Sequence, residues 1–186
     1  MKVCARVLGG LLLLWTAVSV AADWRLEPAA SRLAFHATYE GADAPGVFQK
    51  FDVRLSFDPE HPDNGMLQVT VMLGSADMGS TDVNAAIHQS EWFDSAAFPQ
   101  AEFHSKDIRK TEAEHYLAHG TLSVKNRQQE VAVPFSWKQT GKTATMSGEL
   151  VLNRTFFGIG TGEWASGDVI GLDVKVTFTA VVRQTD

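Results

Sequence analysis

The residues best suited to metal or proton chemistry are the six histidines, and two of them, His115 and His119, lie four positions apart. On a helix, that spacing would place two imidazoles side by side and suit a metal ion. Here both lie in an alternating segment typical of a strand, where four positions at about 3.3 Å per residue separate them by about 13 Å. We therefore interpret them as surface histidines, and the sequence predicts no metal site.

Three further patterns are relevant to catalysis or cofactor binding, and none has its required context. The chain contains no Gly-x-Ser-x-Gly nucleophile elbow. Glu91, Asp94 and Glu102 form only a loose acidic group, which is typical of solvated carboxylates. The glycines in 158–162 are not followed by a helical pattern, so the dinucleotide-binding fingerprint is not met. The sequence therefore predicts a protein that is not an enzyme.

The N-terminal 22 residues are typical of a secretory signal peptide. Lys2 and Arg6 precede an apolar stretch that ends in small residues. The alternative is a retained membrane anchor, but the apolar stretch is shorter than the roughly 20 residues that a spanning helix needs. The sole cysteine, Cys4, lies in this segment, so we expect an exported domain, residues 23–186, without disulfides.

Composition limits the partners of the exported domain. The chain has 186 residues, 45% hydrophobic and 20% charged, with a net charge of −6. Removal of residues 1–22 takes away two of the 16 basic residues and none of the 22 acidic ones, which leaves a net charge of −8. Binding to nucleic acid requires clustered Lys and Arg, so an acidic chain of this kind argues against it.

Alternation of apolar and polar residues with a period of two dominates residues 23–186 and predicts about eight strands. The alternating segments are 33–37, 51–57, 67–73, 101–105, 116–125, 131–137, 144–152 and 170–182. Their short connections imply antiparallel neighbours. We expect one all-β domain, and the alternation is compatible with either a closed barrel or a sandwich.

One segment, 75–99, departs from this alternation. Ser80 and Asp82 are typical of a helix N-terminus, and Val83, Ala86 and Ile87 then recur at helical spacing. The sequence predicts one short helix near 82–92, with Trp92 and Phe93 at its end.

The expected mature chain keeps all 11 Phe, four Trp and both Tyr, and many of them lie where strands meet segment 75–99. One interpretation is that these rings pack a solid core. The other is that they line an apolar cavity, which would bind a ligand through the removal of apolar surface from water.

At these residues the chain resembles the YceI-like, polyisoprenoid-binding family of exported bacterial proteins. The motifs that carry the resemblance run in order from 24 to 183: Trp24-x-Leu26-x-Pro28-x-x-Ser31-x-Leu33-x-Phe35, Gly46-x-Phe48-x-x-Phe51, Phe57-Asp58-Pro59-Glu60, Glu91-Trp92-Phe93-Asp94, Phe98-Pro99-x-Ala101-x-Phe103-x-Ser105, Gly120-x-Leu122-x-Val124 and Asn153-Arg154-x-x-Phe157-Gly158-Ile159. One departure follows Lys125, where Asn126-Arg127-Gln128-Gln129 replaces the family's Gly and Thr-Lys pair.

The resemblance implies an antiparallel eight-stranded lipocalin-like barrel, with the helix inserted near 82–92 and an elongated apolar lumen. It implies a periplasmic binding or carrier protein for a long isoprenoid lipid, either a polyprenol or a quinone-like molecule, as cargo rather than cofactor. A membrane cytochrome b561-type protein is the partner that the resemblance suggests, and a homodimer is an assembly state that we consider.

Strand parity then assigns the expected ligand-binding residues. Inward-facing residues expected to line the lumen are Phe35, Phe51, Val69, Phe103, Tyr116, Leu122, Phe135, Met146, Leu150 and Phe157. Trp92 and Phe93 are expected near the mouth, with access controlled by loops 75–99 and 156–167. Arg154 is assigned either to a polar head group or to fixing a loop. A one-residue error in register would turn every member of a strand outward.

Two alternatives remain beside the carrier. The first is a non-enzymatic soluble partner of a membrane redox system, whose barrel would be filled by side chains. The second is an enzyme that acts on a lipid-like amphiphile, which would need titratable groups that converge in the lumen.

Overall fold

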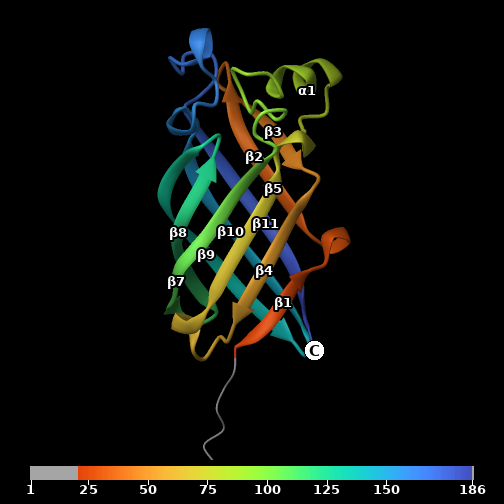
Figure 1. Ribbon diagram of the computed structural model, residues 1–186, viewed down its shortest axis with the longest axis vertical. Helices are drawn as coiled ribbons and strands as arrows, with labels where there is room; N and C mark the ends of the chain where they lie inside the picture. Colours follow the sequence, from red (N-terminus) through yellow and green to blue (C-terminus); the bar gives the residue numbers. More distant parts are fainter. Residues whose placement is uncertain (1–20, 186) are drawn as a thin grey trace, which may run out of the picture.

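The computed structural model describes residues 21–185 and shows an all-β barrel whose long axis is vertical in Figure 1. The expected signal peptide lies outside the described residues, apart from its last two. The strands are β1 (Ala22–Leu26), β2 (Arg32–Tyr39), β3 (Ala42–Phe48), β4 (Phe51–Phe57), β5 (Met66–Met72), β6 (Ala76–Asp77), β7 (Gln100–Glu112), β8 (His115–Val124), β9 (Arg127–Thr140), β10 (Thr143–Asn153) and β11 (Asp173–Gln184). The helices are α1 (Thr81–Ile87) and the 3-10 turns η1 (Pro28–Ala30), η2 (Pro62–Asn64), η3 (Leu73–Ser75), η4 (Arg154–Phe157) and η5 (Gly162–Trp164).

Eight antiparallel strands close into a ring in the order β1-β4-β5-β7-β8-β9-β10-β11. The ring closes where β1 pairs with β11, with Trp24 opposite Gln184 and Leu26 opposite Val182. Closure removes the open edges that a flat sheet would expose. The predicted eight-stranded antiparallel barrel is therefore confirmed, and the alternative of a sandwich is excluded.

Strands β2, β3 and β6 extend the barrel wall at its upper end. β2 pairs with β11 directly above β1, from Arg32 opposite Thr179 to His36 opposite Lys175. The segment 33–37, predicted as a ring strand, is thus β2, and the shorter β1 takes the ring position below it. β3 was missed because it contains Pro45 and Gly46, two residues that are rare in strands.

The inserted helix is shorter than predicted. α1 begins at Thr81, where the Ser80 hydroxyl accepts a hydrogen bond from the Val83 N–H, and it ends at Ile87 rather than near 92. The helix ends because the chain turns back on itself: the Phe93 N–H donates to the Ile87 carbonyl at 3.0 Å. This turn directs the residues after α1 back toward the barrel.

The lower end of the barrel is closed by packed aromatic rings. Phe57 is fully buried, with its ring centroid 5.1 Å from both Tyr116 and Trp137 and 6.0 Å from Phe135. Trp24 packs edge-on against Trp137 at 5.0 Å. These rings fill the lower barrel as a solid core, so any ligand space must lie above them.

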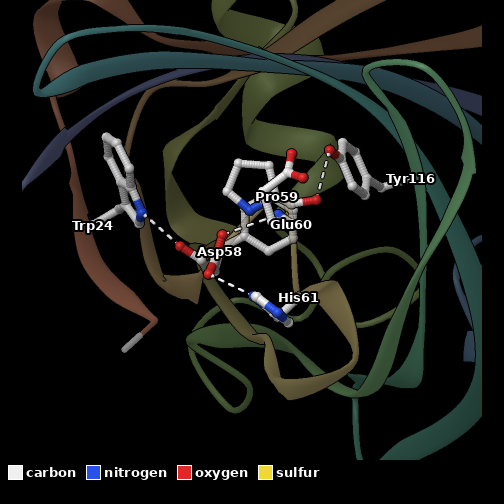
Figure 2. Close-up of polar contacts among 7 residues, drawn as sticks. Trp24, Asp58, Pro59, Glu60, His61 and Tyr116 are labelled. Atoms are coloured by element: carbon white, nitrogen blue, oxygen red, sulfur yellow. Dashed lines mark hydrogen bonds and ion pairs between the residues drawn. The ribbon is translucent and has the colours of Figure 1, made fainter. Parts of the chain in front are cut away.

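A turn after β4 covers this closed end, as Figure 2 shows. The Trp24 indole N–H donates to the Phe57 carbonyl at 3.2 Å, and the Tyr116 hydroxyl donates to the Pro59 carbonyl at 3.3 Å. Within the turn, Asp58 accepts from the Glu60 N–H at 2.9 Å. Two core rings thus hold the turn through its backbone.

Candidate functional site

The upper half of the barrel encloses an apolar cavity of about 750 Å³. Its wall is made of inward side chains of the sheet, with α1 and the loop that follows β10 at the upper end. Along β11 the lining runs from Val174 to Ala180, which corresponds to about 20 Å at 3.3 Å per residue. Pockets of this size accommodate small organic ligands.

Most of the expected lining residues lie on this cavity. Eleven of the thirteen do so: Phe35, Phe51, Val69, Trp92, Phe93, Phe103, Leu122, Met146, Leu150, Arg154 and Phe157. Two of them, Phe35 and Phe93, meet at the top with their ring centroids 6.4 Å apart. Phe48, which also lines the cavity, lies 5.7 Å from Phe93. The structure thus brings together aromatic residues from β2, β3 and the segment after α1.

Two expected lining residues, Tyr116 and Phe135, do not lie on the cavity. Both point inward, but they stack on each other at 5.4 Å in the closed lower end, beside Phe57. Burial and nearby carboxylates, Glu60 first, raise the pKa of Tyr116. Their role in the structure is to form the floor below the cavity.

Other lining residues were not singled out from the sequence. Val174, Val176 and Phe178 on β11 share the inward parity of their strand, so the alternation already contained this signal. Tyr39 and Ile170 line the upper end and pair with each other across an isolated bridge. Nothing in the sequence indicated that those two positions meet.

The mouth lies at the upper end, between the β2–β3 turn, α1 and the loop 158–172 (Figure 1). Cavity-lining residues reach solvent there: Tyr39 is 48% exposed and Val83 is 41% exposed. The two loops expected to control access are joined to each other. The N–H groups of Gly160 and Thr161 both donate to the Glu91 carbonyl, at 2.7 and 3.0 Å.

Arg154 organises the loop that follows β10. Its side chain is 3% exposed, and its guanidinium donates five hydrogen bonds of 2.5–3.0 Å, all to backbone carbonyls. Those carbonyls belong to Ile159, Gly160, Trp164, Ile170 and Gly171. Burial lowers the pKa of Arg154 from its ordinary value.

A guanidinium has five N–H groups, and Arg154 uses all of them within the protein. Arg154 therefore fixes the loop, and it has no free N–H group left to contact a head group. Gly160 is required beside it, because a Cβ there would lie 2.0 Å from the guanidinium nitrogen. That glycine also adopts a φ of +73°, which side chains disfavour.

Lys125 joins the two upper loops from the β8–β9 turn. Its ammonium donates to the carbonyls of Ser90, Trp92 and Gly158 at 2.6–3.0 Å. Burial lowers the pKa of Lys125 from its ordinary value. The turn itself has two left-handed residues, Lys125 and Asn126, with φ of 48° and 59°. The β8–β9 hairpin therefore forms despite the departure from the family's usual residues.

Replacement of Lys125 by Met should lower the free energy of unfolding by about 2 kcal/mol, because three carbonyls lose a charged donor. Amide hydrogen exchange should rise in residues 88–98 and 158–160. Lys138→Met, at an exposed position of β9, is the matched control and should have little effect. Equal exchange in the two variants would contradict this role for Lys125.

The carboxylates at the cavity wall point toward solvent. Glu102 is 46% exposed beside His104, and Asp43 is 63% exposed beside His36. Among the described residues, no group of three or more His, Cys, Asp and Glu is arranged to hold a metal ion. No helix within residues 21–185 has the length and apolar character needed to cross a membrane. The interior thus offers apolar contact as its main means of binding.

Comparisons with known proteins agree with this architecture. Burkholderia cenocepacia BcnA is similar in structure, with a TM-score of 0.82 and 31% identity over 84% of this chain and 98% of that one. A polyisoprenoid binding domain from Saccharophagus degradans, described as implicated in plant cell wall breakdown, shares the fold with a TM-score of 0.71. It is 14% identical over 90% of this chain and 100% of that chain.

Two curated relatives match over parts of the chain. A UPF0312 protein of Photorhabdus laumondii is 28% identical over 79 residues, which cover 42% of this chain and 41% of that protein. A UPF0312 protein of Enterobacter sp. strain 638 is 30% identical over 111 residues, 56% of this chain and 58% of that protein. These matches therefore span about half the length of the relatives.

The family to which the chain belongs follows from a match to a family model along nearly the whole barrel. The profile of the YceI-like domain matches residues 24–182, from β1 nearly to the end of β11. This range includes the ring, its upper extension and the whole cavity wall. The chain belongs to the YceI-like domain family.

Proposed function

We propose that this protein is a periplasmic carrier that holds a long isoprenoid lipid, a polyprenol or a quinone-like molecule, in the cavity of its barrel. The observation that carries the proposal is the 750 Å³ cavity, which is apolar, closed below by aromatic rings and open at the upper end. The binding described for the Saccharophagus degradans domain supports the choice of an isoprenoid.

The length of the cavity indicates how much of an isoprenoid chain it can enclose. The lining along β11 spans about 20 Å. One leaflet of a bilayer has a hydrocarbon depth of about 15 Å, half of the full core. A chain slightly longer than one leaflet, such as the 20-carbon geranylgeranyl group, should therefore lie in the cavity with its distal end near Met146 and Ala180.

Apolar burial supplies the binding energy. Each methylene transferred out of water contributes about 0.8 kcal/mol, and the same gain is available in a membrane. The cavity can therefore hold a lipid during transfer through water without trapping it permanently. This balance suits a carrier in an aqueous compartment such as the periplasm, and the acidic composition suits a protein that stays in solution there.

The rival role is a soluble partner of a membrane cytochrome b561-type protein that carries no lipid. This role requires a barrel filled by its own side chains. The lower half meets that condition, but the upper half does not. We therefore keep such a cytochrome as a proposed partner of the carrier rather than as the basis of a separate function. The remaining rival, an enzyme, would need several titratable groups that converge in the lumen. The titratable lining groups are Tyr39, which is exposed at the mouth, the solvent-facing Asp43 and Glu102, and the fully engaged Arg154.

The direct test is identification of the bound lipid. The purified protein should yield an isoprenoid lipid on extraction with organic solvent, detected by mass spectrometry. The delipidated protein should bind added geranylgeraniol, measured by the change in fluorescence of Trp92 and Trp164, whose rings lie 5.8 Å apart at the mouth. Recovery of no lipid together with no binding of geranylgeraniol or ubiquinone would refute the carrier function.

A further inference from the structure

The barrel wall has a slit between the upper parts of β9 and β10. Their ladder begins at the hairpin, with Thr140 opposite Thr143, and ends with Ser136 opposite Ser147. Within the described chain, residues 127–135 of β9 have no partner on β10, and residues 148–153 of β10 have none on β9. The backbone groups that face this slit therefore lack ladder partners.

The slit is flanked by regular structure on both sides. β8 pairs with β9 up to Val124 opposite Arg127, and β10 pairs with β11 up to Asn153 opposite Asp173. Pro134 lies where the two strands separate, and proline supplies no N–H to a ladder. The sequence thus ends the β9–β10 pairing at a defined point, and the two intact strand pairs, β8–β9 and β10–β11, diverge above it.

The slit forms a second hollow of about 380 Å³ that adjoins the main cavity. Val131, Leu150 and Leu152 line both spaces. The side chains of these three residues are therefore the boundary between the apolar lumen and the slit. An amphiphilic ligand whose chain lies in the lumen could place its polar end here, at the side of the barrel.

Gln129 gives the slit a polar group without a partner. Its Oε1 atom is buried and accepts no hydrogen bond within the protein. Gln129 lies opposite Leu122, a residue that lines the cavity, so the two side chains share the inner face. A buried acceptor without a partner is costly, and a ligand that donates a hydrogen bond would satisfy it.

Charge restricts the head group further. The ionisable side chains that line the slit, Glu130 and Glu149, are both acidic. Lys106 lies 2.9 Å from Glu130, but it does not line the slit. Two carboxylates and an unpartnered acceptor disfavour a phosphate and favour an uncharged donor.

We propose that the β9–β10 slit is the head-group site of the cavity and takes an uncharged, hydroxyl-bearing head group, with Gln129 as its hydrogen-bond acceptor. The inference rests on the proposed function, because it requires an apolar chain in the lumen. It separates polyprenols and phenolic isoprenoids from polyprenyl phosphates, and it places the polar end at the wall rather than at the mouth.

The first test compares three 20-carbon probes: geranylgeraniol, its methyl ether and geranylgeranyl phosphate. The ether lacks the hydroxyl proton but keeps the chain. Wild-type protein should bind the alcohol about 3- to 10-fold more tightly than the ether, a typical effect of one hydrogen bond. Gln129→Leu should remove that difference. Gln128→Leu, at the exposed neighbouring position, is the matched control and should preserve it.

The phosphate should bind at least about 10-fold more weakly than the alcohol, and Glu130→Gln combined with Glu149→Gln should narrow that gap. If the wild-type protein bound the alcohol and the ether with equal affinity, as Gln129→Leu is expected to do, the head-group site would be overturned. The carrier function would remain intact. Binding of none of the three probes would instead refute the carrier function itself.

The second test locates the head group directly. A geranylgeranyl probe with a photoreactive diazirine at its polar end should label the tryptic peptides 128–138 and 143–154, which contain the two edges of the slit. Labelling confined to peptide 33–50, which contains the β2–β3 turn at the mouth, would overturn the proposal.

Discussion

Replacement of Val69 by Asp should lower the affinity for geranylgeraniol at least about 100-fold, because binding would strip water from a carboxylate. Val69 lies on β5 opposite Phe103, and both residues line the cavity. Val69 is only half-buried because its side chain faces the open space. In the empty protein the new carboxylate can therefore stay hydrated, and the variant is expected to fold. Binding would be measured by the fluorescence titration used for the wild type.

The matched control is Gln68→Asp, one position earlier on the same strand. Gln68 is exposed, and successive residues of a strand point to opposite faces, so its carboxylate would lie outside the barrel. Circular dichroism and thermal melting would show that both variants are folded. Unchanged binding by a folded Val69→Asp protein would contradict the use of the cavity, and equal loss of binding in Gln68→Asp would show an effect of charge alone.

Alternation predicted which residues face the inside of the barrel, because the side-chain period of a strand is two. Val53, Leu55 and Phe57 of β4 are buried while their neighbours Asp52 and Arg54 are exposed, as the pattern indicates. Closure into a ring did not follow from alternation. It depends on the pairing of β1 with β11, two segments more than 150 positions apart, and such pairings leave no local signal.

Alternation also did not predict at which level along the barrel axis an inward-facing residue lies. Phe103 and Tyr116 both point inward, but Phe103 lines the cavity, whereas Tyr116 belongs to the solid floor. The difference arises from the neighbours across the barrel, where Phe57 and Trp137 fill the space beside Tyr116. A lining role could therefore be assigned only after the strands were placed relative to one another.

Of the two residues that define the slit, Pro134 could be recognised from the sequence and Gln129 could not. Pro134 stands inside an otherwise regular strand pattern, and a proline there indicates an unpaired edge. Gln129 gave no such indication, since a glutamine in a hairpin usually faces water. The burial of its Oε1 atom follows from the inward parity that it shares with Leu122, so this feature could be found only from the register of β8 and β9.

Arg154 was visible in the sequence as part of a motif, but its partners were not, because they are backbone carbonyls. Five carbonyls converge on it only when the loop 159–171 wraps around its side chain. The glycines at 158, 160 and 162 indicated a loop, and all three adopt positive φ. They did not indicate that this loop is built around a cation.

Replacement of Arg154 by Met should therefore lower the free energy of unfolding by about 3–5 kcal/mol, since several buried carbonyls lose their donors together. Trp92 should also lose its packing partner, because the guanidinium carbon lies 5.6 Å from its ring centroid. The expected consequences are a lower melting temperature and faster amide exchange across residues 158–171. Because this loop borders the mouth, release of bound geranylgeraniol should become faster as well.

Arg154→Lys tests the reason for this effect. Lysine keeps the charge but has three donors, so it can satisfy at most three of the five carbonyls, and its loss of stability should be smaller than that of Arg154→Met. Arg183→Met is the control for the loss of an arginine. Arg183 is 62% exposed and pairs with Glu27 at 2.7 Å, so its removal should cost less than about 1 kcal/mol. If Arg154→Met and Arg183→Met unfolded at the same denaturant concentration, the five hydrogen bonds from Arg154 to backbone carbonyls would not be what stabilises the loop.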